Sequence, residues 1–132
     1  MTKKQYIILG VTILAIILII TLILINNKNT TWTKEIINSN SYEIYKTDCN
    51  NNETKLENST MTTIDKYWNE LSNNGPWIGE DACYEKITIK YDINGIIQER
   101  EILIIDNSSV VLTTNNISYY YVNAENLIKA LK

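Results

Sequence analysis

The two cysteines are the side chains whose chemistry this sequence constrains most. Cys49 and Cys83 are the only cysteines in 132 residues, so an intramolecular disulfide can join only these two. The chain has no C-x-x-C motif and no histidine to activate a thiolate, which disfavours a catalytic thiol pair. The pair therefore predicts a structural disulfide, and closing such a loop stabilises a small domain by roughly 3 to 4 kcal/mol.

Two adjacent acidic residues, Glu80 and Asp81, form the other pattern with a catalytic meaning. Paired carboxylates close to an aromatic residue, here Trp77, are typical of glycoside hydrolases. Adjacent side chains usually point apart, and an acidic turn after Gly79 explains the pair more simply. Because histidine, the commonest general base and zinc ligand, is also missing, we expect no catalytic residues, no metal site and no cofactor.

Aromatic residues are the better candidates for a binding surface. Trp77 lies in a segment flanked by proline and glycine, where the backbone tends to hold a side chain at the surface. In the run 119–121, Tyr119 and Tyr121 share one side of a strand and Tyr120 takes the other. Tyrosine must also fill the core, since the chain has no phenylalanine. We name Trp77, Tyr119 and Tyr121 as possible contacts for a partner.

One amphipathic helix is predicted over residues 61–72. Thr62 and Asp65 resemble a capping box at its start, and the sequence of residues 73–76, with glycine and proline, predicts its end. Its apolar stripe consists of Ile64, Tyr67, Trp68 and Leu71.

A β-hairpin is predicted around Asn94 and Gly95, because a two-residue turn of this type needs positive φ at both positions. The turn places Ile93 opposite Ile96 and so fixes the register of both strands. Arg100 then falls on the apolar face, which suggests an end or an edge of the sheet there. The expected pairs include Ile87 with Ile102, Ile89 with Arg100, and Lys90 with Glu99.

A second hairpin and a closing helix follow. Residues 110–114 and 117–122 are predicted to pair across Asn115 and Asn116. Asn123 is the expected cap of a short helix over residues 124–131, with Leu127, Ile128 and Leu131 turned inward.

The region before the amphipathic helix is less regular. Residues 33–37 and 42–46 are predicted to be short strands, and residues 47–59 an exposed polar loop. The fold class is therefore α+β: one small domain with an antiparallel meander of about four strands, one packed amphipathic helix and a short C-terminal helix, to which one or two N-terminal strands could add.

An apolar stretch, Tyr6–Ile25, precedes this domain. About twenty uncharged residues at 1.5 Å each span the roughly 30 Å hydrocarbon core of a bilayer. The stretch is longer than the hydrophobic region of a signal peptide, and no small-x-small cleavage site follows, which favours an uncleaved signal anchor over a cleaved signal peptide. The chain thus divides into a transmembrane helix (1–28), a juxtamembrane linker (29–41) and a small extracytoplasmic domain (42–132).

Charge and cysteine content set the expected location and partners. Lys3 and Lys4 precede the apolar stretch and Lys28 and Lys34 follow it, so the positive-inside balance is nearly even. The cysteine pair favours a cytoplasmic N-terminus and a C-terminal domain outside. Nine of the twelve cations and all fifteen acids lie in residues 29–132, and this net charge of −6 argues against a nucleic-acid partner and against adhesion to anionic lipid.

These observations together predict a single-pass membrane protein bound to the bilayer through Tyr6–Ile25. We expect a non-enzymatic interaction or accessory protein of the cell or viral envelope, presenting a disulfide-stabilised domain to a protein or polysaccharide partner. The alternative is an envelope hydrolase acting on glycan or peptide through Glu80 and Asp81.

Overall fold

The computed structural model describes residues 1–28, 32–79 and 82–132, and residues 24–28 by their backbone only. The chain divides into two compact units, Met1–Trp32 and Thr33–Lys132. Residues 33–41 belong to the second of these units.

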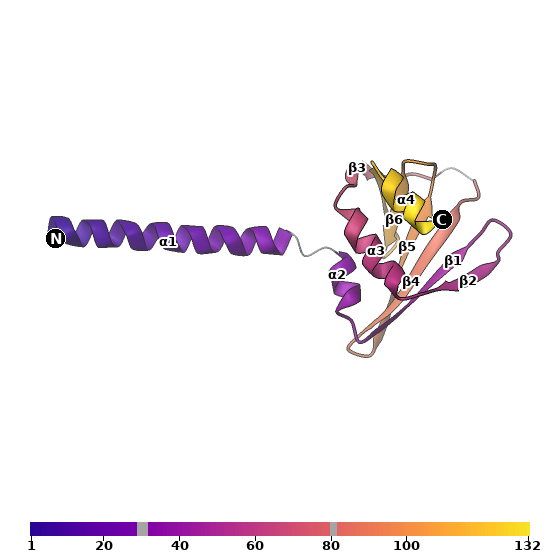
Figure 1. The fold of residues 1–132 in the computed structure, drawn as a ribbon, viewed down its shortest axis with the longest axis horizontal. Helices are drawn as coiled ribbons and strands as arrows, with labels where there is room; N and C mark the ends of the chain where they lie inside the picture. The colour runs from indigo at the N-terminus through magenta and orange to yellow at the C-terminus, as the bar shows by residue number, and fades with distance from the viewer. Residues whose placement is uncertain (29–31, 80–81) are drawn as a thin grey trace. The chain divides into compact units, whose positions relative to one another are not determined.

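Helix α1, Lys3–Lys28, is the main element of the first unit (Figure 1). Its segment Lys3–Ile23 has a mean hydropathy of 3.0 and none of it is buried. The hydroxyls of Thr12 and Thr21 donate to the carbonyl oxygens of Ile8 and Ile17, so these polar groups are satisfied within the helix. The chain thus has an N-terminal helix long and apolar enough to span a membrane.

The second unit is an antiparallel sheet covered by short helices, which confirms the α+β class. Within the described residues the sheet has seven strands, more than the predicted four, in the order β2-β1-β4-β5-β6-β7-β3. Its elements are α2 (Trp32–Ile37), β1 (Ser41–Thr47), β2 (Glu53–Leu56), α3 (Ser59–Trp68), β3 (Ser72–Pro76), β4 (Glu85–Ile93), β5 (Ile96–Ile104), β6 (Val110–Thr114), β7 (Ile117–Val122) and α4 (Glu125–Leu131).

The helices α2, α3 and α4 lie on the same face of this sheet (Figure 1). Each contacts a side chain of that face, as the register and the alternation of side chains show. The contacts are Glu35 of α2 with Arg100, Trp68 of α3 with Tyr121, and the carbonyl of Leu131 in α4 with Lys46. We call this side the helix face and the opposite side, which carries Lys86 and Thr88, the open face.

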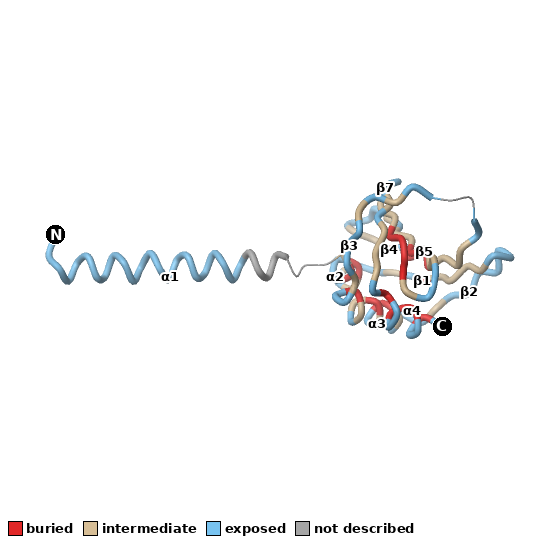
Figure 2. The backbone as a smooth tube through the Cα atoms, turned by 90° about the horizontal axis from the view of Figure 1, so that it is seen from above, coloured by how far each residue is buried: buried red, intermediate tan, exposed pale blue. Residues whose placement is uncertain are grey.

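The core lies between the sheet and the helices, where the buried backbone gathers in Figure 2. Burying an aliphatic side chain of this size contributes about 1.5 to 3 kcal/mol, so this layer holds the domain together. From the sheet it contains Ile44, Ile87, Ile89, Tyr91, Ile102, Val110 and Leu112, and from the helices Ile36, Met61, Ile64, Trp68, Leu127, Ile128 and Leu131.

Both predicted hairpins are confirmed. Asn94 and Gly95 have φ values of 53° and 85°, and the strands pair with Ile93 opposite Ile96, as expected. Asn115 and Asn116 also have positive φ, 50° and 65°, and join β6 to β7. Asparagine tolerates this left-handed conformation better than other residues with a Cβ atom, so both turns follow from local sequence.

Arg100 lies opposite Ile89 as predicted and pairs with Thr114, the last residue of β6, but of the two predicted locations, an end or an edge of the sheet, the edge is wrong. Strand β5 has three strands on each side of it. The arginine side chain, 14% exposed, donates to the hydroxyls of Tyr91 and Thr114 at 3.2 and 3.0 Å and pairs with Glu35 at 3.4 Å. A charged group is tolerated at mid-sheet because these partners replace its hydration.

Two predictions for the N-terminal part of the domain are wrong. Residues 33–37 form helix α2 rather than a strand, because burial of Thr33 and Ile36, three positions apart, suits one helical face. The predicted loop at 47–59 contains strand β2, which pairs with β1. Both elements depend on distant partners that a short window of sequence does not contain.

The amphipathic helix is confirmed, but its ends differ from the prediction. Helix α3 begins at Ser59 and ends at Trp68, and residues 72–76 form edge strand β3 beside β7. Asp65 is not part of a capping box: its carboxylate accepts a 2.6 Å hydrogen bond from Thr33 and pairs with Lys34 at 3.5 Å. Through these two contacts, Asp65 links α3 to α2.

The closing helix is confirmed with a different cap. Leu127, Ile128 and Leu131 are buried as expected, but Ala124 occupies the N-cap position. Asn123 has φ of 62° and its amide donates to the hydroxyl of Ser72 at 3.3 Å, so it joins this helix to β3 instead.

We predict that Arg100→Met destabilises the domain by about 1 to 3 kcal/mol, because the hydroxyls of Tyr91 and Thr114 lose a charged donor at a mostly buried site. Glu35→Gln, altered at the solvent-exposed end of the same network, is the matched control and should cost less than about 1 kcal/mol. Chemical denaturation followed by tryptophan fluorescence measures both. Equal stability of Arg100→Met and the parent chain would show that the network contributes nothing.

Candidate functional site

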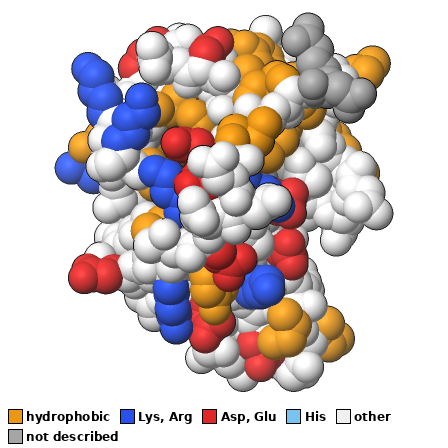
Figure 3. All heavy atoms as spheres, turned by 90° about the vertical axis from the view of Figure 1, so that its right-hand side faces the viewer, with side chains coloured by type: hydrophobic (Ala, Val, Ile, Leu, Met, Phe, Trp, Pro, Cys, Tyr) orange, Lys and Arg blue, Asp and Glu red, His pale blue; other side chains and the backbone are white. Residues whose placement is uncertain are grey.

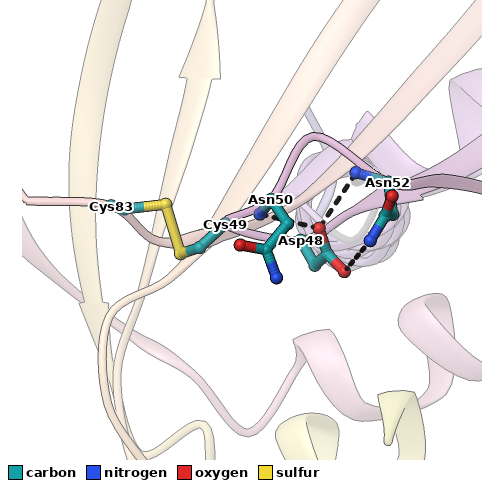
Figure 4. The surroundings of a disulfide bond; sticks show 5 residues. All are labelled: Asp48, Cys49, Asn50, Asn52 and Cys83. Atoms are coloured by element: carbon teal, nitrogen blue, oxygen red, sulfur yellow. Dashed lines mark hydrogen bonds between the residues drawn. A yellow bond between two sulfur atoms is a disulfide. The ribbon is translucent and has the colours of Figure 1, made fainter.

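The predicted disulfide is present and fixes one end of the sheet. Cys49 and Cys83 are joined, with their Cα atoms 5.7 Å apart and 34 positions apart in sequence. Cys49 lies in the turn between β1 and β2, and Cys83 lies two residues before β4 (Figure 4). The bond therefore ties the turn of the outer hairpin to the start of a central strand.

Asp48 organises the same turn (Figure 4). Its Oδ1 accepts hydrogen bonds from the backbone N–H groups of Asn50 and Asn52, both at 2.9 Å, and its Oδ2 accepts one from the Asn52 amide at 3.1 Å. These donors, with the backbone N–H of Asn52 first, lower the pKa of Asp48 below its ordinary value. Asn51 takes the left-handed position, φ 61°, that the turn requires.

Trp77 lies on the open face, beside the disulfide. Its backbone N–H donates to the carbonyl of Ser118 at 3.0 Å, which continues the pairing of β3 with β7. Its indole meets the ring of Tyr84 edge-on, with ring centroids 6.1 Å apart. It also borders two hollows, of about 330 and 300 Å³.

The side chains around these hollows form one patch. We call Trp77, Ile78, Tyr84, Leu103, Ile105 and Tyr120 the Trp77 patch. Polar groups border it on the side of the disulfide, among them Asp48, Asn51 and Lys86. The patch thus combines aromatic surface with hydrogen-bonding groups at its margin.

The position of the indole depends on Gly79. A Cβ atom at this position would lie 2.6 Å from an indole carbon of Trp77, so any other residue would displace the ring. Ile78, between them, is 94% exposed. A large apolar side chain is therefore presented to solvent next to a half-buried tryptophan.

The structure does not bring Tyr119 and Tyr121 together with Trp77. The register of β6 and β7 puts both tyrosines on the helix face, opposite Leu112 and Val110. Tyr121 packs against Trp68 with ring centroids 4.9 Å apart, and burial raises its pKa. Tyr119 is 39% exposed at the margin of the same face.

Sequence reasoning missed Tyr84 and Tyr120 as members of the patch. The alternation along 119–121 already assigned Tyr120 to the face opposite its neighbours, so that signal was available. Tyr84 precedes a strand, and no local pattern marks it. Glu80 and Asp81 lie outside the described residues, and among the described residues no group of three or more acidic, cysteine or histidine side chains is placed to hold a metal ion.

Two ion pairs lie elsewhere on the open face. Lys86 meets Glu101 at 3.6 Å and Lys55 meets Glu43 at 3.4 Å. The hydroxyl of Tyr45 donates to Glu43, and together with Lys55 it lowers the pKa of that carboxyl. Figure 3 shows lysine and acidic side chains interspersed over much of the surface in that view and hydrophobic side chains gathered towards its top. Because each charge lies next to an opposite charge, these side chains produce little net electrostatic field that could attract a partner.

The two tryptophans should differ in their contribution to stability. Trp68 is 6% exposed and faces the core, so Trp68→Ala should cost roughly 3 to 5 kcal/mol. Trp77→Ala, which removes a half-buried ring from the open face, should cost only about 1 kcal/mol. Thermal melts of the two variants test this, and equal losses would make Trp77 a core residue.

Loss of the disulfide should destabilise the domain by roughly 3 to 4 kcal/mol on the chain-entropy model. The measurement compares denaturation of the parent chain with the double variant Cys49→Ala, Cys83→Ala. Reduction of the parent chain is the independent control and should give the same shift. Two thiols titrating in the native, unreduced protein would contradict the pairing.

Asp48 should make the outer turn sensitive to acid. A carboxyl whose pKa is lowered by folding contributes stability above its ordinary value of 3.8, and that contribution disappears as the pH falls through the folded-state pKa. Asp48→Ala should therefore melt at a lower temperature than the parent at pH 7, and the difference should shrink as the pH falls below 3.8 and through the lowered pKa of the folded state. If the difference in melting temperature between Asp48→Ala and the parent stays constant with pH, the ionisation of Asp48 does not cause it.

Comparison of the chain with protein-family models, curated proteins and solved structures finds no match. The open face itself carries the Trp77 patch at one end, ion pairs on its strands, and a disulfide that holds the adjoining hairpin.

Proposed function

We propose that this chain is a single-pass membrane protein whose C-terminal domain is presented outside the cytoplasm as a non-enzymatic interaction or accessory module of the cell or viral envelope. The apolar helix α1 supplies the anchor. The disulfide supports export, because such bonds persist mainly in oxidising compartments. Anchor and disulfide together favour a cytoplasmic N-terminus.

The observation that carries the binding role is the Trp77 patch. A tryptophan held in position by Gly79, bordered by two hollows and next to the exposed Ile78, has the features of an interface anchor. Its polar margin suits a protein or polysaccharide partner, since both combine apolar surface with hydrogen-bonding groups. The acidic domain disfavours nucleic acid as that partner.

The hydrolase alternative depends on Glu80 and Asp81. No observation on the described residues favours it, so the binding role is proposed alone.

Topology is tested with epitope tags at the two ends of the full chain. We expect the C-terminal tag to be accessible to antibody on intact cells and the N-terminal tag only after permeabilisation, because one span separates them. Alkaline extraction should leave the protein in the membrane fraction. Recovery of the chain in the soluble fraction, or an N-terminal tag accessible on intact cells, would contradict the proposed arrangement.

The binding role is tested on the detergent-solubilised full chain. Binding to isolated envelope membranes and to envelope polysaccharide is measured by co-sedimentation for the parent, Trp77→Ala and Tyr119→Ala. We expect Trp77→Ala to weaken binding at least tenfold, whereas Tyr119→Ala, on the helix face, should bind like the parent. Equal binding by all three would exclude the Trp77 patch.

A further inference from the structure

The two edges of the sheet differ in how they are protected. Edge strand β3 contains Gly75 and Pro76 and has a register irregularity between Asn73 and Pro76. Proline lacks a backbone N–H, and such irregularities are common devices that prevent an edge from pairing. The other edge, β2, is regular, and its Glu53, Thr54 and Lys55 are exposed. Edge strand β3 is therefore blocked from pairing with a further strand, whereas edge strand β2 is available for it.

The open edge is also held in place. Strand β2 pairs with β1 through four residue pairs, from Ile44 with Leu56 to Thr47 with Glu53. The turn that joins them contains the Asp48 hydrogen bonds and Cys49, whose disulfide ties it to the segment before β4. A strand fixed in this way loses little conformational freedom when another strand joins it.

We propose that β2 pairs antiparallel with β2 of a second copy of this chain, so that two sheets join edge to edge about a two-fold axis. Such isologous pairing needs a strand that is complementary to itself. In an antiparallel pair, two directly opposed residues point to the same face of the sheet. A residue on the open face of one copy must therefore lie opposite an open-face residue of the other copy, and this limits the possible registers.

Charge selects one of these registers. Pairing Glu53 with Glu53, or Lys55 with Lys55, places like charges directly opposite each other, which is destabilising. Pairing Thr54 with Thr54 instead places Glu53 of each chain opposite Lys55 of the other chain. This gives two pairs of opposite charge, both on the open face. The sequence Glu53-Thr54-Lys55 is thus self-complementary about Thr54. Centring the pair on Leu56 would oppose Lys55 to Glu57, but Glu57 lies outside β2, so that register pairs fewer residues of the strand.

Lys55 is already part of an ion pair on that face, 3.4 Å from Glu43 of its own chain. In the proposed register it lies between this carboxylate and Glu53 of the second copy. The edge-to-edge pair therefore extends an existing row of alternating charges.

A four-residue strand offers few hydrogen bonds, so the pairing should be weak between chains in solution. Two chains anchored in one bilayer meet at a much higher effective concentration, which favours it there. This last point rests on the proposed membrane anchorage, whereas the register of the pair does not.

The first test is a cross-link in the full chain, in membranes. Thr54→Cys puts two thiols on the two-fold axis, where Cα atoms of opposed residues are about 4.5 to 5.5 Å apart, within the range of a disulfide. Mild oxidation should give a covalent dimer on a non-reducing gel. Asn73→Cys, also exposed but on the blocked edge β3, is the matched control and should give at least tenfold less dimer. Equal yields from the two variants would overturn the proposal.

The second test uses charge to check the register. In the Thr54→Cys background, Glu53→Lys and Lys55→Glu each place like charges opposite each other in a homodimer, so each chain alone should cross-link at least tenfold less. Co-expressed with different tags, the two chains become complementary and should form the mixed dimer selectively. Unchanged cross-linking of the single variants, or failure of the mixture to recover it, would overturn the Thr54 register. A parent-like melting temperature confirms that each variant is folded.

Discussion

The register of the hairpin β4–β5 is the constraint on which the domain depends. The turn at Asn94 and Gly95 allows one alignment, and this alignment puts Ile87, Ile89 and Ile102 on a single face. Strand β1 then pairs with β4 and strand β6 with β5, so each outer strand takes its register from the central pair. A slip of one residue would turn the isoleucines toward solvent and leave the helices α3 and α4 without a surface to cover.

This register also separates two kinds of surface. The helix face buries the core, and the mostly buried side chain of Arg100 on this face is satisfied by Tyr91, Thr114 and Glu35. On the open face, the Trp77 patch and the disulfide lie side by side. The core and the Trp77 patch therefore lie on opposite sides of one sheet, so a substitution in the Trp77 patch should leave the packing of the core intact.

The apolar helix α1 and the disulfide support the location proposed for these surfaces. An exposed helix with a mean hydropathy of 3.0 favours a bilayer as its environment. In the proposed arrangement, confinement to a bilayer would strengthen weak contacts, both those proposed for the Trp77 patch and the proposed pairing of two copies at β2. The disulfide contributes to both, because it fixes the turn of the outer hairpin and borders the patch.

Elements set by local chemistry could be predicted from the sequence: the apolar helix, the two asparagine turns with their registers, the amphipathic helix and the cysteine pair. Strand β2 and helix α2 could not, because neither has a decisive pattern of its own: β2 forms on β1, and α2 is held through Thr33, Lys34 and Glu35. The composition of the Trp77 patch could be predicted only in part for the same reason. The sequence marked Trp77 by its flanking residues, but only tertiary packing placed Tyr84 and Tyr120 beside it and turned Tyr121 into the core, since faces of a sheet are shared between strands that the chain keeps far apart.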